Sequence, residues 1–270
     1  MLNLKVNGHE VELKSWKFPA GEVGVLIPKV GDNVRVSLIL TMPTSDEIIM
    51  YLNVLDALSR QGVHYSQIEV HIPYLPYGRQ DRACHEGESF ALEVFGRLIC
   101  SLPFFDKIYT KDVHSAMSIL ALERFGNGLV EVINQPQSDC AKYLPKHDAL
   151  IAPDKGAASK AITHFQVAAL GVPCFTILKE RKDGQVTYVD FPFDTISGKV
   201  CVVDDICDGG ATFLALAEML YRTQPEITQL NLYVTHGIFS KGVEELLKKY
   251  ATIYVHNNMN QSVADSVTVI

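Results

Sequence analysis

One stretch constrains the fold of this chain more than any other, and it runs from Lys199 to Leu214 with the sequence KVCVVDDICDGGATFL. It opens with a continuous apolar run, Val200 to Val203, which is typical of a strand buried on both faces of a parallel sheet. Two aspartates and a glycine turn follow, and the residues after Thr212 are strong helix formers. A strand, a glycine turn and a helix in this order direct backbone N–H groups and the positive end of a helix dipole at one small volume. The stretch therefore predicts a phosphate-binding loop.

The adjacent carboxylates of Asp204 and Asp205 do not suit the phosphate itself, because like charges repel. At the end of the strand they are better placed to accept hydrogen bonds from the hydroxyls of a sugar, or to lie near a metal ion. Thr212 adds a hydroxyl donor to the turn. A glycine turn before an ordinary core helix is the other interpretation, and the double aspartate argues against it.

Composition limits the class of protein. At 270 residues the chain is long enough for two ordinary α/β domains, and 47% hydrophobic residues is typical of a globular protein. The net charge of −7 argues against general binding of nucleic acids, although cations focused in one cleft still allow anionic substrates. No apolar run reaches the roughly 18 residues of a membrane span, and the start lacks the features of a signal peptide. The six cysteines form no metal-type CxxC pair, so we expect reduced thiols in a cytoplasmic protein.

Strand and helix patterns alternate along the chain after an amino-terminal hairpin around Asn7-Gly8. We expect strands at 34–40, 68–72, 107–110, 130–133, 150–152, 174–178, 200–203, 230–234 and 252–255, a hairpin arm at 185–191, and helices at 44–61, 90–101, 115–124, 156–170, 213–220 and 242–250. Strands that alternate with helices in this way imply parallel sheets with helices on both faces. The sequence thus predicts an α/β fold in two units, with an amino-terminal domain at 1–140 and a carboxy-terminal domain at 141–270.

Charged or glycine-containing segments follow many of the predicted strands, although only 20% of the residues are charged. They are Arg79-Gln80-Asp81-Arg82, Asp112-Val113-His114, Asp154 to Ala158, Lys179 to Lys182 and Asp204 to Thr212. Each segment by itself also fits an ordinary solvated turn. In open parallel sheets, however, ligands bind beyond the carboxyl ends of the strands. Because the charged segments concentrate there, they indicate an active site.

The last of these segments resembles the ribose-5-phosphate loop that two families share, the phosphoribosyltransferases and the ribose-phosphate diphosphokinases. The run from Tyr77 to Arg82, YGRQDR, is similar to the ATP-binding motif Tyr-x-Arg-Gln-Asp-Arg of the diphosphokinases, which phosphoribosyltransferases lack. Asp112-Val113-His114 resembles the Asp-Leu-His of the same family. The resemblance to the ribose-phosphate diphosphokinases extends from Phe18 to the region of Gly237.

Three further motifs carry the same resemblance. The run from Pro153 to Ala157 is similar to the diphosphate loop Pro-Asp-x-Gly-Gly. Lys179-Glu180-Arg181 resembles the mobile catalytic flag Lys-x-Arg, and the run from Thr235 to Ser240 resembles Thr-His-Gly-x-Phe-Ser. The implied fold is two tandem phosphoribosyltransferase-type domains, each a mostly parallel sheet flanked by helices.

The resemblance also implies a reaction and a role for each motif. It assigns catalysis to His114, Lys179 and Arg181, ATP binding to Phe18, Glu22, Arg79, Gln80 and Asp81, ribose-5-phosphate binding to Asp204, Asp205, Asp208, Gly209, Gly210, Ala211 and Thr212, and the diphosphate loop to Asp154, Lys155, Gly156 and Ala157. Mg²⁺ is the implied cofactor, near His114 and Asp154. The implied reaction transfers the diphosphoryl group of ATP to the 1-hydroxyl of ribose 5-phosphate, in a homo-oligomer that is a dimer or a hexamer.

Three positions depart from the pattern of the family. Ala20 stands where the motif Phe-x-Asp-Gly-Glu has a carboxylate, Ala157 replaces a glycine of the diphosphate loop, and Lys160 replaces an arginine. Two alternatives therefore stay open. A phosphoribosyltransferase would explain the loop that ends at Thr212 but not the motif that begins at Arg79. The other is a non-catalytic homologue that regulates an active synthetase.

Overall fold

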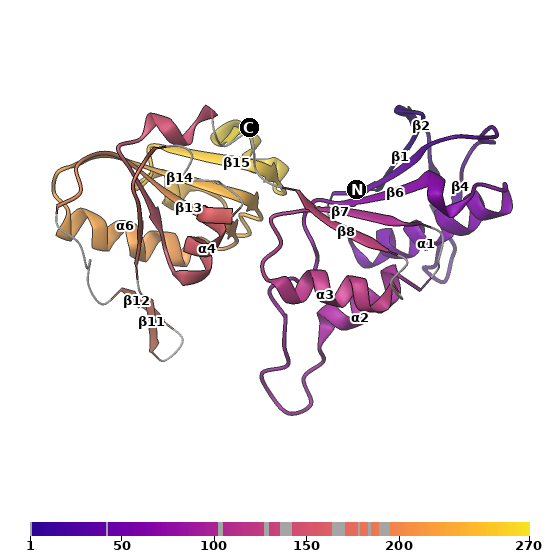
Figure 1. Ribbon diagram of the computed structural model, residues 1–270, viewed down its shortest axis with the longest axis horizontal. Helices are drawn as coiled ribbons and strands as arrows, with labels where there is room; N and C mark the ends of the chain where they lie inside the picture. Colours follow the sequence, from indigo (N-terminus) through magenta and orange to yellow (C-terminus); the bar gives the residue numbers. More distant parts are fainter. Residues whose placement is uncertain are drawn as a thin grey trace. The chain divides into compact units, whose positions relative to one another are not determined.

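The structure of the protein is a computed structural model, which describes residues 2–41, 43–101, 105–126, 130–135, 142–163, 171–177, 179–182, 185–188 and 195–270. The chain divides into two compact units, Met1–Gln135 and Pro136–Ile270, each with its own sheet (Figure 1). The predicted boundary between residues 140 and 141 falls outside the described residues. Among the described residues, no helix has both the length and the apolar character that crossing a membrane requires.

The first unit contains a six-stranded sheet in the order β2-β1-β5-β6-β7-β8. Its strands are β1 (Leu2–Val6), β2 (His9–Val11), β5 (Val36–Leu40), β6 (Ile68–Ile72), β7 (Lys107–Lys111) and β8 (Glu131–Gln135). The hairpin of β1 and β2 turns at Asn7-Gly8 as predicted, and β5 to β8 run parallel. A separate hairpin of β3 (Lys14–Lys17) and β4 (Val23–Leu26) was not predicted, because the side chains of β3 are all exposed and show no buried alternation.

Three helices pack on this sheet: α1 (Ser45–Arg60), α2 (Ala91–Ile99) and α3 (Ala116–Phe125), of which α2 and α3 lie side by side (Figure 1). The helix predicted at 44–61 forms α1, which begins at Ser45 because Thr44 is its N-cap. The Thr44 hydroxyl accepts the Glu47 N–H at 3.3 Å, and the Glu47 carboxylate accepts the Thr44 N–H at 3.0 Å. This reciprocal pair satisfies two backbone donors that the helix itself leaves open.

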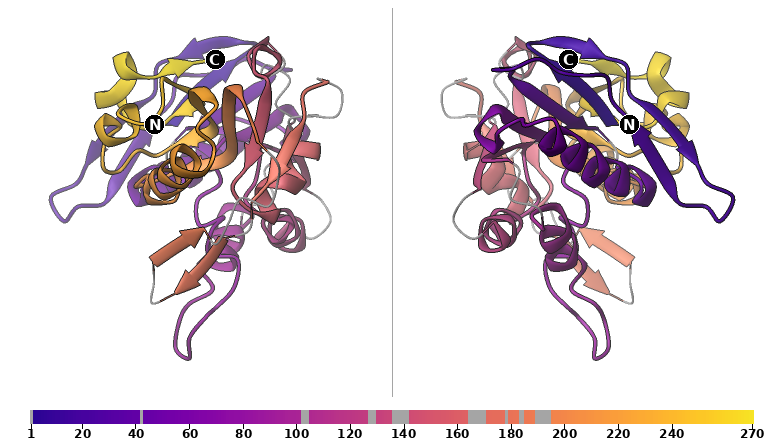
Figure 2. Two further views of the ribbon diagram at one scale, coloured as in Figure 1. Left: turned by 90° about the vertical axis from the view of Figure 1, so that its left-hand side faces the viewer. Right: turned by 90° about the vertical axis from the view of Figure 1, so that its right-hand side faces the viewer.

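The second unit contains a parallel six-stranded sheet in the order β10-β9-β13-β14-β15-β16. Its strands are β9 (Ala149–Ala152), β10 (Cys174–Thr176), β13 (Gly198–Cys207), β14 (Ile227–Gly237), β15 (Thr252–Asn258) and β16 (Thr268–Val269). The helices are α4 (Lys155–Thr163), α6 (Ala211–Thr223) and α7 (Glu244–Leu247). An antiparallel hairpin of β11 (Lys179–Lys182) and β12 (Gln185–Tyr188) stands apart from this sheet (Figures 1 and 2).

The central strand β13 is buried on both faces, as its apolar run predicts. Val200 and Val202 belong to the core that α6 covers, whereas Cys201 and Val203 pack on the opposite face around Tyr233. The mostly parallel sheets with flanking helices confirm the predicted α/β class.

Two predicted element boundaries in the second unit need correction. β13 continues through Cys207, so Asp204 and Asp205 lie within the strand and not after it. The cause is the length of β14, which pairs with β13 as far as Cys207 opposite Gly237. The helix predicted at 242–250 is shorter, since α7 begins only at Glu244 after the left-handed Gly242. Residues 164–170 of the helix predicted to follow Gly156 lie outside the described residues.

Candidate active site

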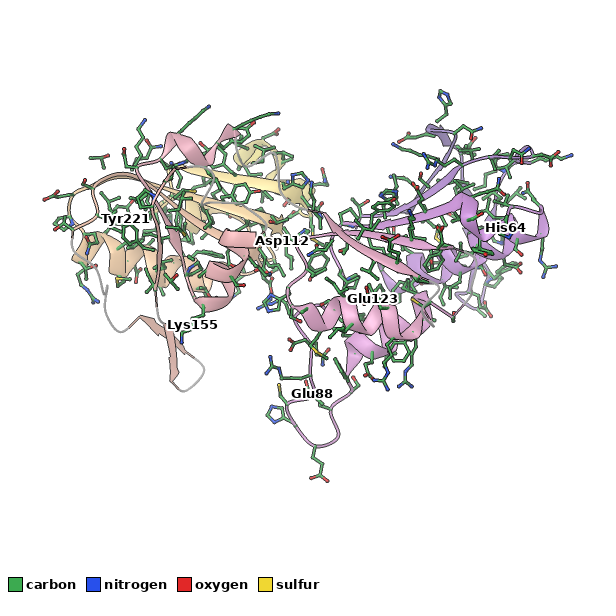
Figure 3. The ribbon with its side chains drawn as sticks, in the orientation of Figure 1. His64, Glu88, Asp112, Glu123, Lys155 and Tyr221 are labelled. Atoms are coloured by element: carbon green, nitrogen blue, oxygen red, sulfur yellow. The ribbon has the colours of Figure 1, made fainter. Side chains whose placement is uncertain are left out.

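The loop between β6 and α2 carries the first candidate motif and projects from the first unit at the position of Glu88 (Figure 3). The Glu88 carboxylate accepts the backbone N–H groups of Cys84 at 2.7 Å and His85 at 3.1 Å. It also accepts the side-chain amide of Gln80 at 3.2 Å. The bond from Cys84, with those from Gln80 and His85, lowers the pKa of Glu88. This carboxylate closes the projecting loop on itself and leaves the Arg79 side chain exposed.

Asp81 links this loop to the segment that follows β7. Its carboxylate accepts a hydrogen bond from Nε of Arg82 at 3.0 Å, and this bond is the main reason why the pKa of Asp81 is lowered. The Ser115 hydroxyl and the nearby His114 ring act in the same direction. Gly78 packs here as well, since a Cβ at this position would lie 3.8 Å from Cβ of His114. The structure therefore brings His114 next to the loop of Arg79, as the rule for strand ends predicts.

Strained backbone marks both of these segments. Tyr77 precedes the motif with a φ of 61°, and Asp112 follows β7 with a φ of 45° and a side chain that is 1% exposed (Figure 3). Left-handed backbone costs energy in residues other than glycine, and it persists where the surrounding structure enforces it. Such strain clusters at functional sites, so it supports this edge of the sheet as a binding site.

Phe18 and Glu22 lie on another element, the turn between β3 and β4. The Phe18 N–H donates to the Glu22 carbonyl at 2.8 Å, and the Phe18 ring packs edge-on against Trp16 with the centroids 5.9 Å apart. The Phe18 side chain remains 49% exposed. The role in nucleotide binding that the resemblance gives to Phe18 and Glu22 stays a prediction.

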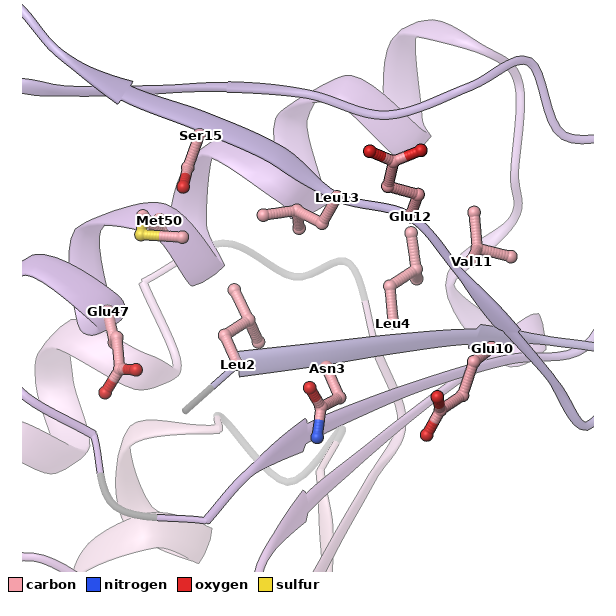
Figure 4. A pocket seen from close by; sticks show the side chains of 10 residues that line it. All are labelled: Leu2, Asn3, Leu4, Glu10, Val11, Glu12, Leu13, Ser15, Glu47 and Met50. Carbon is pink, nitrogen blue, oxygen red and sulfur yellow. The ribbon is translucent and has the colours of Figure 1, made fainter.

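A cavity of about 470 Å³ in the first unit lies beside β1 and the start of α1 (Figure 4). Its wall includes the carboxylates of Glu10, Glu12 and Glu47, and none of the predicted site residues lines it. Because carboxylates repel phosphate oxygens, this cavity does not suit a nucleoside triphosphate.

In the second unit, β13 leads into the predicted phosphate loop. Gly210 has a φ of 78°, and a Cβ there would lie 3.2 Å from Leu246, so this position requires glycine. Gly210 is also the N-cap of α6 and offers no side-chain acceptor to the N–H groups of the first turn. These N–H groups can therefore bind an anion, which the helix dipole also favours.

The two aspartates of β13 have different surroundings. Asp205 forms an ion pair with Lys160 of α4, and both side chains are nearly buried, at 5% and 11% exposed. Burial raises the pKa of Asp204 well above its usual range, and the adjacent Asp205 carboxylate adds to this effect. Lys160 was not predicted as a site residue. Its only signal in the sequence is that it replaces an arginine of the family pattern shortly after the diphosphate loop, because nothing local indicates a contact with β13.

Asp154 lies directly before α4, and its carboxylate accepts the Ala157 N–H at 2.8 Å. Ala157 is 2% exposed, so its methyl group packs in the core, and the change from glycine does not obstruct the loop. Lys155 and Gly156 are exposed at the start of the helix, and Lys155 is labelled in Figure 3.

The acidic surroundings of Asp154 fit the predicted Mg²⁺. Among the described residues, no group of three or more His, Cys, Asp and Glu side chains converges on one point. Mg²⁺ does not require such a group, because it keeps several water ligands and takes one or two carboxylates. Asp154 lies close enough to Asp204 to raise the pKa of that carboxyl, and this local negative charge suits a divalent cation.

Lys179 and Arg181, the residues of the predicted flag, lie on β11. The backbone pairs Lys179 with Tyr188 and Arg181 with Val186 across the hairpin. Their side chains lie outside what the structure describes. Their catalytic contact with a polyphosphate stays a prediction.

Comparison with known proteins identifies the family. The ribose-phosphate pyrophosphokinase of Pyrococcus furiosus is 30% identical to this chain over 242 residues, which are 88% of the chain and 82% of that protein. The chain belongs to the ribose-phosphate pyrophosphokinase family. The ribose-phosphate pyrophosphokinases of Pyrococcus abyssi and Thermococcus kodakarensis are each 29% identical to it, over 90% and 89% of the chain. No protein-family model matches the sequence.

Comparison of three-dimensional structures agrees with this family. The crystal structure of phosphoribosylpyrophosphate synthetase from Mycobacterium smegmatis matches 96% of this chain and 86% of that chain, with a TM-score of 0.74 and 22% identity. This match confirms the predicted fold class, two successive α/β units of the phosphoribosyltransferase type. The predicted family is confirmed too, because diphosphokinase and pyrophosphokinase are two words for the same enzymes.

Proposed function

We propose that this protein transfers the diphosphoryl group of ATP to the 1-hydroxyl of ribose 5-phosphate, with AMP and 5-phosphoribosyl 1-diphosphate as products. The observation that carries the proposal is the packing of the Arg79 loop beside His114, in a chain that is 30% identical to a ribose-phosphate pyrophosphokinase. The resemblance separates the two families at this motif, because the phosphoribosyltransferases lack it.

The sugar phosphate belongs to the second unit in this proposal. The first turn of α6 would bind the 5-phosphate with backbone N–H groups and the Thr212 hydroxyl, because that helix end is open and left uncapped by Gly210. Asp204 and Asp205 would accept hydrogen bonds from the ribose hydroxyls. The ion pair with Lys160 holds Asp205 in one orientation, and it offsets part of the charge that would otherwise repel the substrate.

The nucleotide belongs to the first unit. Arg79 lies exposed on the loop, and Gln80 and Asp81 are tied into the loop by Glu88 and Arg82. In this proposal the Arg79 guanidinium would contact a phosphate group of ATP. Phosphoryl transfer of this kind requires aligned reactants and neutralised charge more than a covalent nucleophile. In this proposal Arg79 would supply such charge and His114 would supply a hydrogen bond, and neither would form a covalent intermediate.

Mg²⁺ is the cofactor that we propose, with His114 and Asp154 as the protein groups assigned to it. When bound, it would neutralise the negative charge of the ATP phosphates. Lys179 and Arg181 would contact the group in transfer as its charge develops, and a flag that closes late would limit hydrolysis of ATP by water. We also propose a cytoplasmic homo-oligomer, a dimer or a hexamer, as the resemblance implies.

One assay tests the proposal against its alternatives. The protein is incubated with ATP, Mg²⁺ and ribose 5-phosphate, and AMP and 5-phosphoribosyl 1-diphosphate are measured by chromatography. We expect both products in equal amounts, and neither product when ribose 5-phosphate is omitted. A phosphoribosyltransferase would yield no AMP here but would consume 5-phosphoribosyl 1-diphosphate when a base is added. Absence of turnover with either substrate set would indicate the non-catalytic homologue.

A further inference from the structure

We propose that Lys241 is a further substrate-binding residue, which contacts the 5-phosphate from a turn beside the phosphate loop. The inference depends on the proposed function for the identity of the ligand. Lys241 comes directly after the motif that ends at Ser240, and it lies outside every motif that the sequence assigns to a substrate. The evidence is the geometry of the turn that follows β14.

This turn is bonded to the end of β13. The backbone N–H groups of Ile238 and Phe239 both donate to the carbonyl of Cys207, at 2.8 and 3.2 Å. The Ser240 hydroxyl donates to the Asp208 carboxylate at 2.6 Å. Backbone and side-chain bonds therefore hold the turn against the first residues of the phosphate loop, and the two segments form one surface.

The turn itself has little freedom. The Gly242 N–H donates to the Phe239 carbonyl at 3.0 Å, which closes a tight turn around Ser240 and Lys241. Phe239 is fully buried with a left-handed φ of 47°, and its ring packs against Gly237. A buried aromatic anchor on one side and a left-handed glycine on the other fix the backbone of Lys241.

The side chain of Lys241 extends along the phosphate loop. A Cβ on Gly209 would lie 3.4 Å from Cδ and 3.5 Å from Cε of Lys241. These distances place the last carbons of the lysine side chain, next to the ammonium group, beside the phosphate loop at Gly209. A Cβ at residue 209 would be in ordinary van der Waals contact with these carbons, so the lysine side chain lies directly over this part of the loop.

Charge points to a phosphate as the partner of this ammonium group. Among the described residues, no carboxylate forms an ion pair with Lys241, and the nearby Asp208 is bonded to Ser240. The uncapped end of α6 offers only about half a positive charge, which is less than a phosphate dianion requires. The neighbouring side chains of β13 are acidic, so Lys241 supplies the full positive charge that the loop lacks.

The test compares Lys241→Met, which keeps most of the apolar side chain without the charge, with Lys241→Arg, which keeps a cation. We expect Lys241→Met to raise the KM for ribose 5-phosphate about tenfold, because one charge-assisted contact is lost. The turnover number and the KM for ATP should change little, and Lys241→Arg should restore most of the affinity. Lys199→Met is the matched control, since Lys199 is an exposed lysine at the opposite end of β13.

A calorimetric titration of each variant with ribose 5-phosphate, without ATP, separates this inference from the proposed function. Weaker binding by Lys241→Met alone supports the inference, even if no AMP forms and the proposed reaction is wrong. A second uncharged variant, Lys241→Gln, is titrated as well. Equal affinities of the wild-type protein, Lys241→Met and Lys241→Gln would overturn the inference while the reaction stands. Failure of the wild-type protein to bind ribose 5-phosphate would overturn both. Thermal unfolding of each variant checks that the fold is intact.

Discussion

The two candidate binding segments of this protein are built in opposite ways. The loop from β13 to α6 offers backbone N–H groups, glycines in enforced conformations and aspartates held within a buried strand. The loop from β6 to α2 offers exposed side chains, and one carboxylate, that of Glu88, closes it on itself. The first site depends on the core of its unit, whereas the second is an array of side chains on a projecting loop. Changes at the first should alter stability and binding together, and changes at the second should alter binding alone.

The largest effect should come from neither segment. In the proposed reaction both of them bind substrates in the ground state, so we expect the transition state to depend on the hairpin that carries Lys179. Lys179→Ala should lower the turnover number about a thousandfold, because an interaction made only in the transition state is lost. Steady-state kinetics should show KM values for both substrates that are little changed. Lys182→Ala on the same strand is the control. A normal turnover number for Lys179→Ala would show that Lys179 takes no part in catalysis.

The next largest effect should follow from Lys160→Met in the second unit. This change leaves the nearly buried Asp205 carboxylate without its cation, and we expect a loss of about 3 kcal/mol in the free energy of unfolding. Chemical denaturation measures this loss, and the KM for ribose 5-phosphate should rise in the same variant. Lys160→Arg keeps the charge and should retain both properties. If Lys160→Met unfolds like the wild-type protein, the site does not depend on the core in the way proposed here.

One glycine from each loop tests whether the backbone of the loop depends on its surroundings. Gly210 and Gly87 both have left-handed φ angles, of 78° and 82°, but only at Gly210 would a Cβ meet a neighbour, Leu246 at 3.2 Å. Gly210→Ala should therefore destabilise the protein by about 2 kcal/mol, from strained backbone and crowding together. Gly87→Ala should cost about 1 kcal/mol or less, from backbone strain alone. Equal losses in thermal or chemical unfolding would show that both loops depend equally on their surroundings.

The smallest effect should separate binding from stability. Arg79→Ala should raise the KM for ATP about tenfold, because one charge-assisted contact with a phosphate group is lost. The KM for ribose 5-phosphate and the unfolding midpoint should not change, since the Arg79 side chain is exposed. Arg60→Ala, at an exposed arginine that pairs with Asp56, is the control. A lower unfolding midpoint in Arg79→Ala would contradict the view that this loop is only an array of side chains.

Most of the fold follows from patterns that the sequence shows locally. The apolar run of Val200 to Val203 predicts a strand buried on both faces, and the two cores around β13 bear this out. The predicted end of that strand was wrong. Pairing with β14 extends β13 past Asp205, although aspartate is disfavoured in strands. The β3–β4 hairpin was missed for another reason. The side chains of β3 are exposed, so its sequence lacks the apolar alternation that identifies a buried strand.

The candidate site was predictable where its residues follow neighbouring parallel strands. It was not predictable where a contact joins elements that are distant in the sequence. Arg79 and His114 follow neighbouring parallel strands, so the rule for strand ends brings them together. The pair of Lys160 and Asp205 joins residues 45 positions apart, and no local spacing indicates it. The packing of Lys241 on Gly209 was missed in the same way, because it depends on a turn after β14 that only tertiary contacts fix.

The place of Asp204 and Asp205 within β13 has a consequence for the choice of sugar. The backbone of a loop residue can shift and carry its carboxylate toward a misplaced hydroxyl. The backbone of Asp204 is paired opposite Val234, so it shifts only together with the strands beside it. A pentose with one inverted carbon would thus present its hydroxyl to acceptors that cannot follow it. If Asp204 and Asp205 bind the ribose hydroxyls as proposed, discrimination between epimers originates in the stiffness of a sheet.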